Sequence, residues 1–194
     1  MTKHRCGWCV GDPLYEAYHD QEWGVPVYDD QTIFEFLILE TFQAGLSWIT
    51  ILRKRENFRE ALDDFDYKKI ARYSEAKLEA LLQNPGIIRN KLKVKATVSN
   101  AQAFIEIQEE FGSFSKYIWS FVNHKPVQNS VKIYKEAPAT TAISDALSKD
   151  LKKRGFKFTG STVVYAHMQA TGMVNDHEVD CFRYAEVKSL GVKP

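Results

Sequence analysis

Apolar side chains recur at helical spacing along most of this chain, whereas the alternation of apolar and polar residues that marks half-buried strands is scarce. Ile33, Phe34 and Leu37 form one such apolar stripe. This stripe predicts a helix from Asp30, whose carboxylate can cap the first turn, to about Ala44. The overall pattern predicts an all-α fold.

Short polar residues predict where further helices begin, because their side chains can accept hydrogen bonds from the first N–H groups of a helix. Glycine and proline predict where helices end. The expected helices begin after Ser47, run from Ser74 to Asn84, from about Asn90 to Glu110, from Ser144 to Arg154, and from Ser161 to Thr171. Residues 123–143 are expected to form the longest irregular connection, and both terminal segments to be less regular. No internal repeat is visible, so one compact unit over residues 1–194 is expected.

The chain has 194 residues, of which 44% are hydrophobic, and is long enough to bury a core. No apolar run approaches the roughly 18 residues that a spanning helix needs, so no membrane partner is expected. The first residues contain no apolar stretch of the kind found in secretion signals. Three cysteines are odd in number and too few for a disulfide framework. We therefore expect a cytoplasmic protein whose cysteines and histidines are free to bind a metal.

The formal net charge of +1 conceals an uneven distribution of charge. Residues 1–50 carry 2 basic and 8 acidic side chains, whereas residues 51–100 carry 12 basic and 7 acidic ones. One face of the molecule could therefore be basic and suited to a nucleic acid. The alternative is that these charges lie on ordinary solvated helix faces.

Possible metal ligands occur near both ends of the chain. Cys6, Cys9 and His19 lie near the start, and His177 and Cys181 lie near the end with a spacing that lets both reach one ion. Thiolate and imidazole are the ligands that Zn²⁺ prefers, and a site with four protein ligands is usually structural. Spacing alone favours Cys6 and Cys9 as the ligand pair that would join His177 and Cys181. Cys6 and His19 are the competing pair. The cysteines could also be small buried hydrophobic residues.

A tight turn separates two predicted helices in the segment 81–91, where Pro85 and Gly86 follow an asparagine. The free N–H groups at the start of the second helix, and the positive end of its dipole, favour a phosphate. Nearby positive charge comes from Arg89, Lys91, Lys93 and Lys95. This arrangement is typical of a helix-hairpin-helix that grips a DNA backbone without reading its sequence. A plain corner with a solvated basic face is the alternative.

One carboxylate and several aromatic residues suggest a site that handles a nucleobase. Glu40 lies in an otherwise apolar helical stretch, where a carboxylate is usually paired or functional, although it could also face water at the helix edge. An enzyme that extrudes a base needs aromatic faces on which to stack it. The aromatic candidates, which could equally be core residues, are Trp8, Tyr15, Tyr18, Trp23 and Trp48.

Taken together, the motifs of this chain resemble those of the bacterial DNA-3-methyladenine glycosylase I family. The matching stretches are Cys6 to Trp8, Asp12 to Asp20, Glu22 to Pro26, Gln43 to Trp48, Trp119 to His124, Lys152 to Phe158, and Asn175 to His177. They extend from residue 6 to about residue 181 in the order of the family.

The resemblance implies an all-α helix-hairpin-helix DNA glycosylase, with the hairpin at about residues 75–110. It also implies one structural Zn²⁺ that joins the terminal segments, at about residues 1–25 and 172–194. The implied ligands are Cys6, His19, His177 and Cys181, which leaves Cys9 as an extra thiol beside the site. This set differs from the pair that spacing alone favours.

The resemblance also implies roles for pocket and hairpin residues. Glu40, Tyr18 and Trp48 correspond to the residues that recognise the base, with Trp8 and Tyr15 nearby in the pocket. The DNA backbone contacts are expected at Gly86, Ile88, Arg89 and Lys91. No convincing catalytic aspartate follows the hairpin, so Glu40 is the expected catalytic residue, acting through recognition and electrostatics.

The implied activity is that of a monofunctional glycosylase, a monomer that hydrolyses the N-glycosidic bond of N3-methyladenine in alkylated double-stranded DNA. Methylation at N3 gives the base a positive charge, so its bond to deoxyribose is already weak. Three alternatives remain: a DNA-damage-binding protein without enzymatic activity, a glycosylase that cuts the strand with Lys91 as nucleophile, and a zinc hydrolase, which would need an open coordination position.

Overall fold

The computed structural model describes residues 3–43 and 45–190. The helices are α1 (Pro13–Gln21), α2 (Asp30–Gln43), α3 (Trp48–Ala61), α4 (Tyr67–Ile70), α5 (Glu75–Gln83), α6 (Lys91–Phe111), α7 (Phe114–Ser120), α8 (Ala142–Lys153), α9 (Ser161–Ala170) and α10 (Phe182–Leu190). Two short 3-10 helices, Asp63–Phe65 and Tyr134–Glu136, and two strands, β1 (Val127–Gln128) and β2 (Val174–Asn175), complete the described elements. The predicted end of α2 at Ala44, and the outermost residues of both predicted terminal segments, fall outside the described residues.

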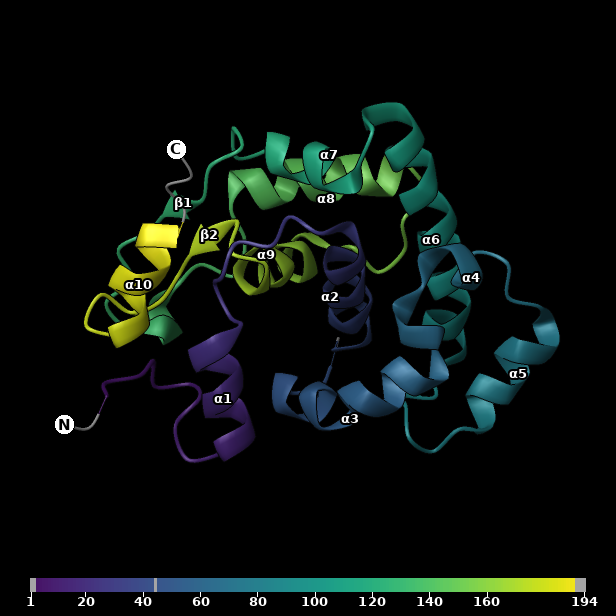
Figure 1. The fold of residues 1–194 in the computed structure, drawn as a ribbon, viewed down its shortest axis with the longest axis horizontal. Coiled ribbons are helices and arrows are strands. Elements are labelled where there is room, and N and C mark those ends of the chain that lie inside the picture. Colours follow the sequence, from purple (N-terminus) through teal and green to yellow (C-terminus); the bar gives the residue numbers. More distant parts are fainter. Residues whose placement is uncertain (1–2, 44, 191–194) are drawn as a thin grey trace.

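Helix α2 lies at the centre of the fold and packs against α3, α6, α7 and α9 (Figure 1). Its side chains are buried at every position from Phe36 to Phe42, because apolar residues surround the helix on all sides. One cluster of buried hydrophobic residues extends from Cys6 to Cys181. No described helix combines the length and apolarity needed to cross a membrane.

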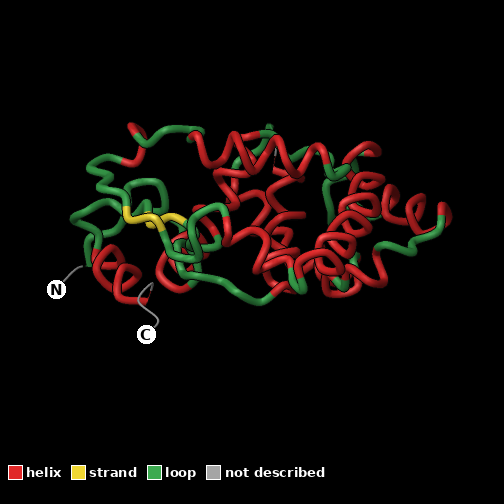
Figure 2. The backbone as a smooth tube through the Cα atoms, turned by 90° about the horizontal axis from the view of Figure 1, so that it is seen from above, coloured by secondary structure: helices red, strands yellow, loops and turns green. Residues whose placement is uncertain are grey.

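The expectation of an all-α fold needs one correction, because β1 and β2 pair in parallel with Val127 opposite Val174. Two residues per strand are too few to produce an alternating pattern in the sequence. Figure 2 shows the two strands, in yellow, toward the end of the molecule at which the described part of the chain begins and finishes. The connection predicted over residues 123–143 contains β1 and a 3-10 helix and is otherwise irregular.

The predicted cap of α2 is wrong, because Asp30 caps a different helix. Asp29 accepts a hydrogen bond from the backbone N–H of Thr32 in the first turn of α2, at 2.8 Å. The Asp30 carboxylate instead accepts from the backbone N–H groups of Phe114, at 2.9 Å, and Ser115, at 2.7 Å. It therefore satisfies the free donors at the start of α7 and ties that helix to α2.

Two further helix starts differ slightly from the predicted ones. Thr141 caps α8, and Ser144 is the third residue of that helix and completes a capping box with Thr141. Ser161 is the first residue of α9 rather than its cap, and its hydroxyl lies 2.8 Å from that of Ser144. The starts at Ser47, Ser74 and Asn90 are confirmed.

Candidate functional site

A pocket of about 300 Å³ opens between the N-terminal segment, the C-terminal end of α2, the start of α3, and α9. Its lining residues are Trp8, Tyr15, Tyr18, Trp23, Glu40, Gln43, Ser47, Trp48, Tyr134, Ala166 and Gln169. All five residues predicted to bind a base therefore line one cavity, although they come from three separate stretches of chain. Lys91 is not among the residues that line it.

Glu40 is buried in this pocket with only 3% of its surface exposed, so it does not face water at a helix edge. Its Oε2 atom has no hydrogen-bond partner, and burial raises the pKa of the carboxyl group well above its ordinary value. A buried carboxylate oxygen without a hydrogen-bond partner is energetically unfavourable. Such a group is typical of a binding site, where a ligand supplies the missing partner.

Other unpaired polar atoms surround Glu40. In the described part of the chain, eight buried side-chain nitrogen and oxygen atoms lack a hydrogen-bond partner. Four of them lie in this pocket: Trp8 Nε1, Tyr18 Oη, Glu40 Oε2 and Trp48 Nε1. Three hydrogen-bond donors and one acceptor therefore lack partners within one aromatic cavity.

The aromatic rings meet mostly at steep angles rather than stacking on one another. The rings of Trp8 and Tyr15 have centroids 4.7 Å apart at 64°, and those of Trp8 and Trp23 are 5.0 Å apart at 67°. Tyr18 and Trp48 lie 5.7 Å apart at 50°. Edge-to-face contacts fix the rings.

Tyr134 and Gln169 also line the pocket, and they were not predicted from the sequence. Tyr134 lies in the irregular connection, where no periodic pattern indicates burial, yet its ring centroid is 6.0 Å from that of Trp8. Gln169 is 6% exposed and belongs to α9. A polar residue on a buried helix face was the only available signal for Gln169.

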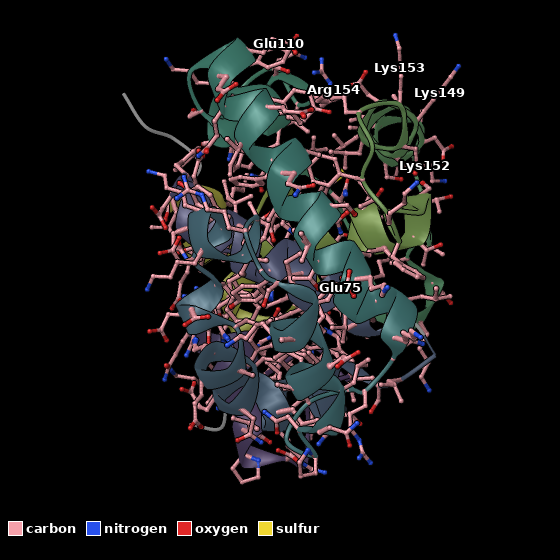
Figure 3. The ribbon with its side chains drawn as sticks, turned by 90° about the vertical axis from the view of Figure 1, so that its right-hand side faces the viewer. Glu75, Glu110, Lys149, Lys152, Lys153 and Arg154 are labelled. Carbon is pink, nitrogen blue, oxygen red and sulfur yellow. The ribbon has the colours of Figure 1, made fainter. Side chains whose placement is uncertain are left out.

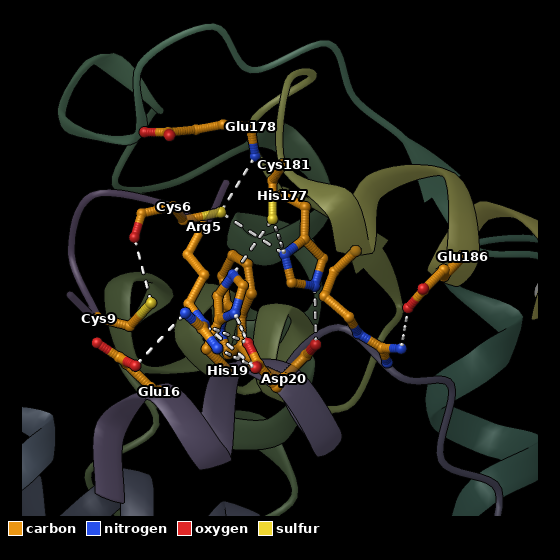
Figure 4. A network of polar contacts seen from close by, with 12 residues as sticks. Arg5, Cys6, Cys9, Glu16, His19, Asp20, His177, Glu178, Cys181 and Glu186 are labelled. Carbon is orange, nitrogen blue, oxygen red and sulfur yellow. Dashed lines mark hydrogen bonds and ion pairs between the residues drawn. The ribbon is translucent and has the colours of Figure 1, made fainter. Parts of the chain in front are cut away.

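The predicted metal ligands lie close together, although they come from segments near both ends of the described chain (Figure 4). One ligand atom from each of Cys6, His19, His177 and Cys181 lies within 4.8 Å of the others, and all four residues are buried. Cys181 Sγ lies 3.5 Å from His19 Nε2 and 3.7 Å from His177 Nδ1. Cys6 Sγ lies 3.6 Å from His177 Nδ1. Ligands at 2.0–2.3 Å from a tetrahedral Zn²⁺ would be separated by about 3.5 Å, so the group could hold such an ion.

The outer nitrogens of both histidines are held in place. His177 Nε2 donates to the carbonyl of Trp23 at 3.0 Å, which leaves Nδ1 free to face the sulfurs. His19 Nδ1 lies 2.8 Å from Asp20 Oδ1, which leaves Nε2 toward Cys181. Partners of this kind orient the ligands of metal sites.

Two negatively charged sulfurs at this distance would repel each other unless a cation lay between them. Contact with Cys181 raises the pKa of the Cys6 thiol, and contact with Cys6 lowers the pKa of the Cys181 thiol. Cys9 is outside the group, because its thiol donates to the carbonyl of Cys6 at 3.2 Å. The pair that spacing alone favoured, Cys6 with Cys9, is therefore not the one that the fold brings to the histidines.

The predicted hairpin lies between α5 and α6, over residues 84–90, and is fastened to α3. Lys54 Nζ donates to the Pro85 and Gly86 carbonyls at 3.3 and 3.2 Å, and Asn57 donates to the Gly86 carbonyl at 3.3 Å. A Cβ atom at Gly86 would lie 2.9 Å from Asn84 Oδ1 and 3.1 Å from Asn57 Cβ. A side chain at this position would therefore crowd Asn84 and Asn57, and glycine avoids this crowding.

Only some of the N–H groups expected to be free at the hairpin are free. The Asn90 side chain accepts from Leu92 and Lys93, so two donors of the first turn of α6 are already bonded. Within the described part of the chain, the backbone N–H groups of Ile88, Arg89 and Lys91 have no hydrogen-bond acceptor.

Two of the lysines expected to add charge at the hairpin have other partners. Lys93 is buried and donates to the Phe42 carbonyl at 3.0 Å. Lys95 lies 3.6 Å from a carboxylate oxygen of Glu75. The positive charge available at this end of α6 therefore comes mainly from Arg89 and Lys91, which are both exposed.

Part of the uneven charge distribution is explained by pairing between the two quarters of the chain. Arg55 contacts Glu22 at 2.7 Å and Glu35 at 2.6 Å, and Arg59 contacts Glu35 at 2.8 Å. These arginines neutralise acidic residues of the first quarter instead of forming a basic face.

Exposed lysines are grouped on another element. Figure 3 shows Lys149, Lys152 and Lys153 projecting from α8, while Arg154 beside them pairs with Glu110 at 2.6 Å.

A family model described as methyladenine glycosylase matches residues 8–184. The chain belongs to this family. As a methyladenine glycosylase it is similar to DNA-3-methyladenine glycosylase 1 of Escherichia coli, with 51% identity over 180 residues, which are 93% of this chain and 96% of the relative. The resemblance seen in the sequence is thereby confirmed.

Solved structures of the family show the same fold as this methyladenine glycosylase. A crystal structure of 3-methyladenine DNA glycosylase I superposes with a TM-score of 0.90 at 50% identity, covering 92% of this chain and 98% of that one. A structure from Staphylococcus aureus, described as the basis of 3-methyladenine recognition, has a TM-score of 0.89 at 37% identity. It covers 98% of this chain and 97% of that one.

Proposed function

We propose that this glycosylase excises N3-methyladenine from alkylated double-stranded DNA by hydrolysis of the N-glycosidic bond. The observation that carries the proposal is the buried, unpartnered carboxylate of Glu40 inside a pocket with aromatic walls. The names of similar proteins support the same substrate. An extruded base would stack on Tyr18 and Trp48, with Trp8 and Tyr15 nearby.

The electrostatics of Glu40 favour a cationic base over an ordinary one. Burial disfavours the charged form of this carboxylate, so a neutral adenine would leave it poorly compensated. A base methylated at N3 brings its own positive charge and offers N–H donors to the carboxylate. Binding such a base restores the charged form of Glu40, and the base leaves as a neutral molecule. Glu40 therefore contributes by recognition and charge stabilisation rather than as a general base.

We also propose that Cys6, His19, His177 and Cys181 hold one structural Zn²⁺. The donor set and the spacing of the ligand atoms fit a tetrahedral ion. Four protein ligands leave no open position for substrate or water, which argues against a zinc hydrolase. Such an ion would join the N- and C-terminal segments and stabilise the wall of the pocket that Trp23 forms.

The hairpin is proposed to hold the DNA backbone through the unpaired N–H groups of Ile88, Arg89 and Lys91. Gly86 allows the chain to turn closely against α3, and the exposed charges of Arg89 and Lys91 add attraction to phosphate. The buried hydrophobic cluster, which extends from Cys6 to Cys181 among the described residues, supports our expectation that residues 1–194 form one domain. A cytoplasmic monomer remains our expectation for this protein.

The activity is tested by incubating the protein with duplex DNA treated with a methylating agent and identifying the bases released. Release of N3-methyladenine without strand cleavage is expected, and failure to release this base would overturn the proposal. A protein that retained methylated DNA without releasing a base would be a damage-binding protein. Trapping of a covalent DNA adduct by borohydride would favour the strand-cutting alternative, in which Lys91 is the nucleophile.

A further inference from the structure

A buried carboxylate lies directly behind the pocket. Asp176 follows β2, is 1% exposed, and receives three hydrogen bonds, from Asn129 Nδ2 at 2.6 Å, Tyr165 Oη at 2.7 Å and Gln169 Nε2 at 2.8 Å. It also lines a second cavity, of about 420 Å³, on the side of residues 129–138. Gln169 lines the pocket that contains Glu40, so its bond to Asp176 connects the linings of the two cavities.

The bond to Asp176 determines how the Gln169 amide is turned. An ionised carboxylate only accepts hydrogen bonds, so the amide nitrogen of Gln169 must face Asp176 and its oxygen must face away from it. On the other side, Tyr134 Oη lies 3.4 Å from Gln169 Oε1. This separation is longer than a typical O–H···O bond, and a carbonyl oxygen has two lone pairs. Gln169 Oε1 therefore keeps the capacity to accept a strong hydrogen bond at the wall of the pocket.

We propose that Gln169 is a specificity-determining residue whose Oε1 accepts a hydrogen bond from the exocyclic amino group of the bound base, and that Asp176 is the residue that positions it. The inference rests on the proposed function. The amino group of N3-methyladenine offers two N–H donors, which Glu40 and Gln169 can share. A methylated guanine carries a carbonyl oxygen at the same ring position, and that oxygen would oppose the Gln169 oxygen.

Asp176 is needed as a positioning residue because an amide group can be turned in either of two directions. An unconstrained glutamine can present either its oxygen or its NH₂ group, which have almost the same shape. With Asp176 behind it, Gln169 presents only an acceptor to the pocket. If residue 176 were itself an amide, Gln169 could turn over and present a donor.

The direct test compares the release of N3-methyladenine and N3-methylguanine from the same methylated duplex under single-turnover conditions. Gln169→Met keeps the length of the side chain and removes the amide. We expect the rate for N3-methyladenine to fall about tenfold or more, and the rate for N3-methylguanine to change much less. An equal loss for both bases would indicate a merely structural role and would overturn the proposal.

The second test separates positioning from general damage to the buried network. Asp176→Asn allows the amide to turn and is expected to lower the ratio of the two rates in the same direction as Gln169→Met. Combining Asp176→Asn with Gln169→Glu exchanges the two groups, keeps one carboxylate in the pair and returns an oxygen to the pocket. This exchange is expected to restore the ratio toward that of the wild type.

Tyr165→Phe is the matched control, because it removes one donor to the same carboxylate but leaves the Gln169–Asp176 bond unchanged. Its ratio should equal that of the wild type. A ratio that falls as far in Tyr165→Phe as in Asp176→Asn, or that stays unchanged in both Gln169→Met and Asp176→Asn, would overturn the proposal. If Gln169→Met does not fold, as judged by thermal unfolding, Asp176→Asn and the exchange still decide the matter. A wild-type protein that releases neither base contradicts the proposed function instead, so the two failures are distinguishable.

Discussion

Lys93 donates a hydrogen bond from Nζ to the backbone carbonyl of Phe42 at 3.0 Å, although 51 residues separate them in the chain. Lys93 lies in the first turn of α6, directly after the hairpin, and Phe42 lies at the end of α2, two residues after Glu40. The bond therefore fastens the proposed DNA-binding hairpin to the helix that carries the pocket carboxylate. A positive charge at the C-terminus of α2 also interacts favourably with the dipole of that helix.

Replacing Lys93 with methionine should reduce the free energy of unfolding by about 1–3 kcal/mol, because the buried carbonyl of Phe42 loses its donor. Chemical denaturation measures this change. Lys91→Met is the matched control, since Lys91 is exposed and a few tenths of a kcal/mol is the expected effect there. Equal losses of stability in the two variants would contradict the importance of the Lys93–Phe42 bond.

Glu40→Gln should lower the rate of N3-methyladenine excision at least tenfold and yet stabilise the fold at neutral pH, by about 1–3 kcal/mol. Burial raises the pKa of Glu40, so the folded protein is more stable when this carboxyl group is protonated. The wild-type protein has this stability in full below the ordinary carboxyl pKa. It loses the stability as the pH rises through the raised pKa. Glutamine does not titrate. The stability difference should therefore be small near pH 4 and grow toward pH 7, as followed by denaturant unfolding across this range. A constant difference over the same pH range would refute the buried-charge explanation.

The two cysteines of the N-terminal segment should differ in their effect on zinc. Cys6→Ser should lose most of the bound metal and lower the melting temperature, because it removes one of the four clustered ligands. Cys9→Ser should retain one zinc per chain, since Cys9 is not among the four clustered ligands and its thiol donates to the backbone carbonyl of Cys6. Metal content after gel filtration distinguishes them, and loss of zinc from Cys9→Ser would contradict the proposed ligand set.

Gly86→Ala should weaken binding to duplex DNA while leaving the affinity for free N3-methyladenine unchanged. The added Cβ would come within 2.9 Å of Asn84 Oδ1 and 3.1 Å of Asn57 Cβ, so the Asn84 side chain has to move and the packing of the hairpin against α3 is strained. Fluorescence anisotropy with duplex DNA and titration with the free base measure the two affinities. A parallel loss of both would indicate that the substitution disturbs the whole fold.

Lys91→Ala should reduce the salt dependence of DNA binding, because each lost phosphate contact lowers the slope of log K against log salt concentration by about 1. The same anisotropy titrations at several salt concentrations measure it. Lys93→Ala offers a contrast, since its ammonium group is bonded within the fold and should leave this slope unchanged. An unchanged slope in Lys91→Ala would argue against a contact of this residue with phosphate.

The sequence predicts most of the long helices because a local pattern encodes each of them. The stripe of Ile33, Phe34 and Leu37 and the cap at Asn90 are examples. Prediction from the local sequence is wrong where a side chain forms its hydrogen bonds with a residue far away in the chain. Asp30 looks like the cap of its own helix but bonds to the backbone of Phe114 and Ser115. Helix α1 was missed although Asp12 followed by Pro13 is a helix-start signal that was present in the sequence.

Residues of the site were likewise predictable where the local sequence is unusual, and not where only tertiary contacts bring them together. Glu40 could be singled out because a carboxylate among apolar residues is unusual on any helix. Gln169, Tyr134 and Asp176 could not, because only the tertiary structure shows that they meet behind the pocket. Spacing also misled the choice between Cys9 and His19, since the direction of a side chain depends on the local turn rather than on distance along the chain.

The contact between Trp23 and His177 has a consequence for how the protein is made. Trp23 forms part of the pocket wall, and His177 bonds to its carbonyl across 154 residues of sequence. During synthesis on the ribosome, the N-terminal part of the pocket therefore lacks this support until the segment that carries His177 has been made. A chain truncated before His177 would contain all the residues that line the pocket and would still lack this support for Trp23.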